Sequence, residues 1–134
     1  WAIRRNILLP PGRVLLIEDD PDMSEVIEAY LSEYSIETKT AGDGTDALDI
    51  VRSFSPGLIL LDLRMPIMSG FQFIEQIKHI ELNPTPTIVV ITGKPIRPEE
   101  MVSLKNDQIE VITKDDRFEQ ELHRLLQRNY ALKG

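Results

Sequence analysis

The stretch LILLD at residues 58–62 decides the fold of this chain. Four consecutive apolar residues between Pro56-Gly57 and Asp62 are typical of a short strand that is buried on both faces. Strands of this kind belong to parallel sheets whose two faces are covered by helices. In such sheets, ligands bind beyond the carboxyl ends of the strands. Asp62, which ends this run, is therefore the first candidate for a functional residue.

Similar apolar runs alternate with helical patterns along the rest of the chain. Further strands are expected near residues 14–17, 36–40, 87–91 and 111–112, and each is followed by a helical pattern of apolar residues, which is short and weak after residues 87–91. Parallel strands need such crossovers, and the crossovers are right-handed. The sequence therefore predicts an α/β fold: a five-stranded, doubly wound parallel sheet with five helices, in the flavodoxin-like (βα)5 arrangement.

Residues 1–12 lack this alternation. They contain two arginines and the turn signal Pro10-Pro11-Gly12, and we expect them to form a linker or N-terminal arm. A disordered tail is the alternative. Residues 13–134 then form one domain, because about 100–200 residues is the usual length of a domain.

Composition argues against several classes of protein. The chain has no cysteine, which removes disulfides, thiolate metal sites and a cysteine nucleophile. Its net charge of −7 makes it a poor partner for nucleic acid, because that affinity rests on neutralising phosphates. No apolar run approaches the ~20 residues that span a bilayer, and we find no secretory signal pattern. We therefore expect a cytoplasmic location, with no membrane contact and no nucleic-acid binding within this chain.

Polar residues stand at the carboxyl ends of four expected strands. Glu18 and Asp19 follow the first strand, Asp62 ends the third, Thr92 ends the fourth and Lys114 follows the fifth. Because the carboxyl ends of parallel strands meet at one edge of the sheet, we expect these side chains to converge. Nearby, an aspartate at position 20 precedes a proline, and it fits either the acidic cluster or a helix N-cap.

The charges of this group predict a chemistry. Three carboxylates together would repel one another, and oxygen-rich clusters suit Mg²⁺. A Mg²⁺ ion and Lys114 would balance the three negative charges, so that one carboxylate could accept a phosphoryl group. Asp62 is the best acceptor because the most apolar strand holds it. Thr92 would donate a hydrogen bond to the transferred group.

These segments, taken in order, resemble the receiver domains of two-component response regulators. The resemblance covers Arg13 to about Tyr130, nearly the whole chain, which we therefore interpret as an arm followed by a receiver domain at residues 13–134. Any one segment is weakly specific, and the ordered set is highly specific. The matching segments are VLLIEDDP at 14–21, GDGTDAL at 42–48, LDLRMP at 61–66 with Ser69-Gly70, ITG at 91–93, and Lys114.

The resemblance implies a role for each of these residues. Asp62 would be the phosphoacceptor, while Thr92 and Lys114 would contact the phosphoryl group. Mg²⁺ would be held by Asp62 together with Asp19, Glu18 (mainly through water) and the backbone carbonyl of Arg64. The donor would be a histidine kinase or a histidine phosphotransfer protein, and an output domain could lie outside this chain. The domain would not be an enzyme beyond its own phosphorylation and dephosphorylation.

Two residues depart from the family pattern. Asp115 stands where members usually have a proline, often after a cis peptide bond, and Val111 stands where many have an aromatic residue. These departures keep an alternative open, in which the chain is a degenerate receiver that acts only as a protein-docking module. A flavin-binding protein is disfavoured because the loop after the first strand is acidic and would repel phosphate. A haloacid-dehalogenase-like phosphatase is disfavoured because Arg64 stands where that family needs a second aspartate.

Overall fold

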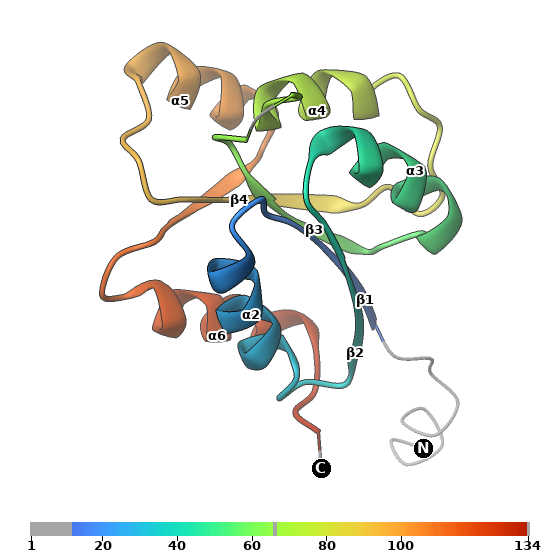
Figure 1. Cartoon of the computed structure of the whole chain (residues 1–134), viewed down its shortest axis with the longest axis vertical. Helices are drawn as coiled ribbons and strands as arrows, with labels where there is room; N and C mark the ends of the chain where they lie inside the picture. Colours follow the sequence, from blue (N-terminus) through green and yellow to red (C-terminus); the bar gives the residue numbers. More distant parts are fainter. Residues whose placement is uncertain (1–11, 66, 134) are drawn as a thin grey trace.

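The computed structural model describes residues 12–65 and 67–133, and within them it shows one sheet covered by helices (Figure 1). The five strands are β1 (Gly12–Ile17), β2 (Ile36–Ala41), β3 (Leu58–Asp62), β4 (Thr87–Thr92) and β5 (Glu110–Thr113). The five helices of this part are α2 (Pro21–Leu31), α3 (Gly44–Phe54), α4 (Gly70–Ile77), α5 (Pro98–Asn106) and α6 (Phe118–Asn129). The expected arm at residues 1–12 lies outside the described residues except for Gly12, which begins β1.

The strand order confirms the predicted doubly wound sheet. The strands lie in the order β2-β1-β3-β4-β5, and all four neighbouring pairs are parallel. Chain order reverses between β1 and β3, which is where folds of this class bind ligands. In this register Ile17 lies beside Leu61, so that the residues after β1 and at the end of β3 emerge together.

Helices cover both faces of the sheet. Figure 1 shows α2 and α6 together on one side and α3, α4 and α5 on the other. Alternate residues of each central strand join different clusters: Leu15 and Ile59 pack with α3, α4 and α5, whereas Leu16 and Leu60 pack with α2 and α6. This explains the continuous apolar runs of β1 and β3, because both faces of these strands are buried.

Local capping fixes where the helices begin. Asp20 is the N-cap of α2, since its carboxylate accepts a hydrogen bond from Asp22 N at 3.0 Å, and Pro21 occupies the first turn. The N-cap interpretation of Asp20 is therefore confirmed. In the sequence, apolar residues at helical spacing continue from Met23 to Tyr34 and favour a helix of that length, but α2 ends at Leu31. Tyr34 is nevertheless buried with α2 and α6, because its ring packs in that cluster from the turn beyond the helix.

The helices are short. None of those in the described part of the chain is both long enough and apolar enough to cross a membrane. Their length instead matches the strands that they cover, as crossover helices of a compact α/β sheet require.

Candidate functional site

The buried polar side chains of the described residues lie at the carboxyl edge of the sheet. Glu18, Asp62 and Thr92 are 3%, 6% and 2% exposed, and they are the buried polar or charged residues among those the structure describes. Glu18 follows β1, Asp62 ends β3 and Thr92 ends β4. Burial of carboxylates is costly unless charge or hydrogen bonds compensate it, so the surroundings of these three residues decide what the site can do.

Lys114 supplies part of that compensation. Its ammonium Nζ donates a hydrogen bond to Glu18 Oε1 at 2.5 Å and lies 4.0 Å from Asp62 Oδ2. The Lys114 side chain is only 14% exposed. Its backbone N–H donates to Thr92 O at 2.7 Å, which fixes the start of the loop after β5 against β4. The structure thus brings Lys114 to the two buried carboxylates.

Asp19 completes an acidic pocket that could hold a metal ion. Glu18, Asp19 and Asp62 each offer one carboxylate oxygen, and these oxygens lie within 4.8 Å of one another. Asp19 is exposed, so the pocket opens to solvent on its side. Carboxylate oxygens with access to water are the donors that a hard divalent cation prefers. The residues present therefore fit the metal that the sequence predicts.

The positive charge near Asp62 does not fully compensate the buried carboxylates. The pKa of Asp62 is raised from 3.8 to about 6, first by burial and then by the neighbouring Glu18, against the lowering effects of the Arg64 N–H and Lys114. The single ammonium therefore does not fully offset two buried carboxylates. A divalent cation would supply the missing charge, which is a second reason why the site fits a metal.

Arg64 contacts both Asp62 and the neighbouring helix α5. Its backbone N–H donates to Asp62 Oδ1 at 3.1 Å. Its guanidinium turns to α5, where Nη2 lies 3.0 Å from Glu100 Oε1 and Nη1 lies 3.4 Å from Glu100 Oε2. The position of its carbonyl as a metal ligand stays a prediction.

Glu100 is a residue that the sequence reasoning missed. The Arg64 guanidinium, followed by Arg97, lowers the pKa of Glu100 to about 2. The sequence did contain a local signal: Glu100 lies three residues after Arg97, in the first turn of the helix that begins at Pro98. That signal indicates a cap, and the Glu100 carboxylate indeed accepts a hydrogen bond from Arg97 N at 3.0 Å. Its contact with a loop 36 residues earlier had no local signature.

The Thr92 hydroxyl is engaged in a local turn. Its Oγ1 donates to Lys94 O at 3.1 Å and lies 3.2 Å from Lys94 N, which donates to it. Thr92 stands at the expected strand end, beside Thr113, the last residue of β5. To donate to a phosphoryl group on Asp62, the hydroxyl would have to leave the Lys94 carbonyl.

The loop after Lys114 adopts its own turn in place of the family's proline. The cis peptide bond found in the described part of the chain is Asn83–Pro84, so the Lys114–Asp115 bond is trans. The Asp115 carboxylate accepts from Arg117 N at 2.9 Å, and its carbonyl accepts from Phe118 N at 3.0 Å. Aspartate is well suited to such a turn, because its side chain bonds to the backbone two residues ahead.

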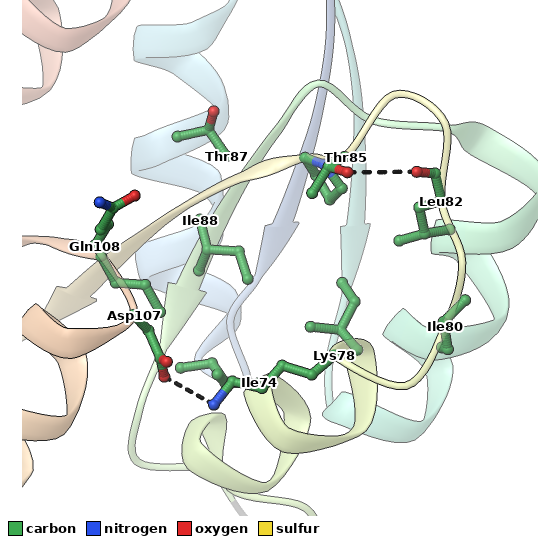
Figure 2. A pocket seen from close by; sticks show the side chains of 12 residues that line it. Ile74, Lys78, Ile80, Leu82, Thr85, Thr87, Ile88, Asp107 and Gln108 are labelled. Carbon is green, nitrogen blue, oxygen red and sulfur yellow. Dashed lines mark hydrogen bonds and ion pairs between the residues drawn. The ribbon is translucent and has the colours of Figure 1, made fainter.

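A separate hollow of about 540 Å³ lies at the opposite, amino edge of the sheet (Figure 2). Its apolar lining comes mainly from the end of α4, the loop after it and the start of β4, including Ile74, Leu82 and Ile88. Figure 2 shows the Lys78 side chain reaching toward Asp107, and the two charged atoms lie 3.0 Å apart. The predicted site residues are absent from its lining.

Known proteins match this chain over most of its length. A match to the response regulator receiver domain family spans residues 14–127. The DNA-binding response regulator MtrA of Mycolicibacterium smegmatis is 32% identical over 108 residues, which are 68% of this chain and 47% of that protein. A protein-glutamate methylesterase/protein-glutamine glutaminase of Rhizobium etli is 39% identical over 85 residues, which are 61% of this chain and 24% of that protein. The chain thus spans about half, or less, of the length of these relatives.

Solved structures show the same fold. The chemotaxis response regulator CheY4 of Vibrio cholerae superposes with a TM-score of 0.76 at 24% identity, covering 88% of this chain and 98% of that one. A CheY-like response regulator receiver domain protein of Methanospirillum hungatei gives a TM-score of 0.71 at 26% identity, covering 84% of this chain and 90% of that one. The family match, the strand order and the acidic edge agree: the chain belongs to the receiver domains of two-component response regulators.

Proposed function

We propose that Asp62 accepts a phosphoryl group from a phosphohistidine, on a histidine kinase or a histidine phosphotransfer protein, with Mg²⁺ bound at the acidic pocket. The observation that carries the proposal is the setting of the Asp62 carboxylate. It is buried at the switch point of the sheet, it accepts the Arg64 N–H at 3.1 Å, and Lys114 lies 4.0 Å away. Receiver domains work with histidine kinases, which gives this acceptor its donor class.

The transfer would exchange one bond for another at phosphorus. A carboxylate oxygen of Asp62 forms the new P–O bond while the P–N bond to the donor imidazole breaks. The imidazole nitrogen keeps the electron pair and takes a proton from solvent. Lys114 is placed to neutralise charge on the transferred group, and the Arg64 N–H is placed to donate to it.

Mg²⁺, when bound, would neutralise phosphoryl oxygens, which is the usual role of this ion in phosphoryl transfer. Glu18, Asp19 and Asp62 are the residues that would hold it. Lys114 now bonds Glu18 at 2.5 Å, whereas Asp62 is its more distant neighbour. Phosphorylation would therefore favour movement of the ammonium from Glu18 toward Asp62.

The whole protein is proposed to be larger than this chain. The relatives extend well beyond the matched region, and one of them is named as a DNA-binding regulator and another as a methylesterase. We infer a cytoplasmic response regulator in which this domain catalyses only its own phosphorylation and dephosphorylation, and another part of the protein produces the output.

A docking module without phosphorylation is the second candidate. The observations that favour it are the trans bond and aspartate turn after Lys114, together with the Thr92 hydroxyl that is bonded to Lys94 O. Both would have to be compatible with a phosphoryl group on Asp62 for the first proposal to hold.

Labelling distinguishes the two candidates. The chain is incubated with Mg²⁺ and a ³²P-labelled acyl phosphate of low molecular mass, and in parallel with a labelled histidine phosphotransfer protein. Phosphorylation of a carboxylate predicts one label per chain that hydroxylamine removes, because hydroxylamine cleaves acyl phosphates. Absence of label from both donors, together with no binding of beryllium fluoride in the presence of Mg²⁺, would favour the docking module.

A further inference from the structure

Arg64 joins the acceptor carboxylate to helix α5. Its backbone N–H bonds Asp62 Oδ1 at 3.1 Å, while its side chain reaches Glu100 across the gap between the loop after β3 and the first turn of α5. Both terminal nitrogens of the guanidinium contact the carboxylate, at 3.0 and 3.4 Å. A two-point contact of this kind fixes orientation as well as distance.

The surroundings make this contact firmer than an ordinary surface ion pair. The Glu100 side chain is 11% exposed and that of Arg64 is 31% exposed. A third bond, from Arg64 Nη2 to Pro95 O at 3.3 Å, ties the same guanidinium to the loop that precedes α5. The side chain of residue 64 is therefore held by two segments that lie outside its own loop.

Glu100 is itself anchored within α5. Its carboxylate accepts a hydrogen bond from Arg97 N at 3.0 Å and one from Arg97 Nη2 at 3.1 Å. These bonds cap the start of the helix, so the Glu100 carboxylate has a defined position relative to the α5 backbone. Movement of α5 is thereby linked to the position of Arg64, and through it to Asp62.

We propose that Glu100 is a positioning residue for the acceptor site, which acts through the Arg64 side chain and couples that site to α5. This inference rests on the function proposed above, in which Asp62 belongs to a site for a metal ion and a phosphoryl group. With its side chain tethered, residue 64 presents its backbone N–H to Asp62 in one preferred geometry, and such preorganisation favours ligand binding. By reciprocity, a ligand bound at Asp62 must in turn change the stability of the start of α5.

The test compares two variants that break the same contact from opposite ends. Glu100→Gln keeps an oxygen that can cap α5 but removes the charge, and Arg64→Gln removes the guanidinium but keeps the backbone N–H. We expect each variant to weaken Mg²⁺ binding, measured through amide chemical shifts, by about 5–10-fold, at the lower end of the usual range of couplings between sites. The double variant should be no weaker than the weaker single variant, because both remove one interaction.

Two control variants separate this contact from general effects of charge. Glu99 is the neighbour of Glu100 on α5, is 71% exposed and lies 3.7 Å from Arg97 Nε. Glu99→Gln removes the same charge from the same turn and should leave Mg²⁺ binding unchanged. Lys78→Gln breaks the ion pair with Asp107 at the other end of α5 and should also leave it unchanged.

A second measurement reads the coupling without any phosphoryl transfer. In wild type, Mg²⁺ with beryllium fluoride should slow hydrogen exchange of amides in residues 100–104, relative to the protein in EDTA. In Glu100→Gln and Arg64→Gln this difference should be lost, while the Arg64 amide resonance in EDTA should shift in Glu100→Gln. Unchanged Mg²⁺ affinity in both variants, or an unchanged exchange response of α5, would overturn the proposal. Because these readouts need no phosphoryl donor, failure of Asp62 to be phosphorylated would be recorded separately.

Discussion

Two lysines of this molecule each lie between two carboxylates, at opposite edges of the same sheet. At the carboxyl edge, Lys114 lies 2.5 Å from Glu18 and 4.0 Å from Asp62. At the amino edge, Lys78 lies 2.9 Å from Glu75 and 3.0 Å from Asp107. The composition of the two clusters is the same, but the Lys114 side chain is 14% exposed and that of Lys78 is 41% exposed.

Burial gives the two clusters opposite properties. At the exposed cluster, the hydrogen bonds that the Lys78 ammonium donates to Glu75 and Asp107 raise the pKa of Lys78, so that the opposite charges stabilise one another. At the buried cluster, desolvation raises the pKa of Asp62 to about 6 even though a lysine is near. Water screens the first cluster and is largely withheld from the second. The buried carboxylates at the carboxyl edge are thus only partly compensated, and a bound cation would stabilise them. The charges at the amino edge already compensate one another.

The largest expected difference between the edges is in phosphorylation. Asp62→Asn should abolish labelling by an acyl phosphate, because the amide is not a nucleophile and has almost the same shape as the carboxylate. Asp107→Asn makes the same chemical change at the amino edge and should leave labelling unchanged. Label per chain, measured after gel filtration, decides the comparison. Full labelling of Asp62→Asn would place the acceptor elsewhere.

The next largest difference is expected between the two lysines. Lys114→Gln should slow phosphorylation about a hundredfold, which is the usual loss when one preorganised charge or donor is removed from a transition state. Lys78→Gln should change the rate less than twofold. The initial rate at saturating Mg²⁺ is the measurement, and circular dichroism confirms that both variants fold. Equal rates in the two variants would show that Lys114 only compensates Glu18.

Sequence patterns predicted the carboxyl edge because its residues are defined by strand ends. Asp62 ends β3 and Thr92 ends β4, and parallel topology alone brings such ends together. Burial of Tyr34 also followed from apolar spacing, although its helix ended three residues earlier. The periodicity of apolar residues reports which side faces the core, and the end of a helix depends on local capping instead.

Contacts between long side chains of distant segments could not be predicted in the same way. Arg64 and Glu100 are 36 residues apart, and each has a local explanation as a loop cation or a helix cap. Their contact depends on how closely α5 approaches the loop after β3. The periodicity of the sequence does not indicate that distance. The Thr92–Lys94 turn was missed for the opposite reason: it is local, but a hydroxyl at a strand end has several possible partners.

A smaller difference between the two edges is expected in thermal stability without metal, when Asp62 or Asp107 is replaced by asparagine. Because the pKa of Asp62 is about 6 in the folded chain, above its ordinary 3.8, the folded state keeps this proton while the unfolded state loses it. Stability therefore falls as the pH rises from about 4 to 6, by at most about 3 kcal/mol from this group. In EDTA at pH 7.5, Asp62→Asn should melt several degrees above wild type, and at pH 4 the gain should shrink.

Asp107→Asn is the matched control for this melting experiment. The Asp107 carboxylate is partly exposed and paired with Lys78 at 3.0 Å, so its removal should give no gain at pH 7.5. A gain of the same size in both variants would show that the chain is stabilised by removing one negative charge from its net charge of −7, rather than by removing the buried carboxylate of Asp62.

The smallest effect is expected from the exposed lysine. Lys78→Gln removes both of its ion pairs, but the Lys78 side chain is 41% exposed and that of Glu75 is 65% exposed, so water already solvates these charges. We expect the melting temperature at low salt to fall by about 2 °C or less, as for other exposed pairs. In about 1 M KCl the Debye length shrinks to roughly 3 Å, and the difference from wild type should then disappear. A larger loss that persists in high salt would mean that the alkyl chain of Lys78, which lines the hollow at the amino edge, contributes by packing rather than by charge.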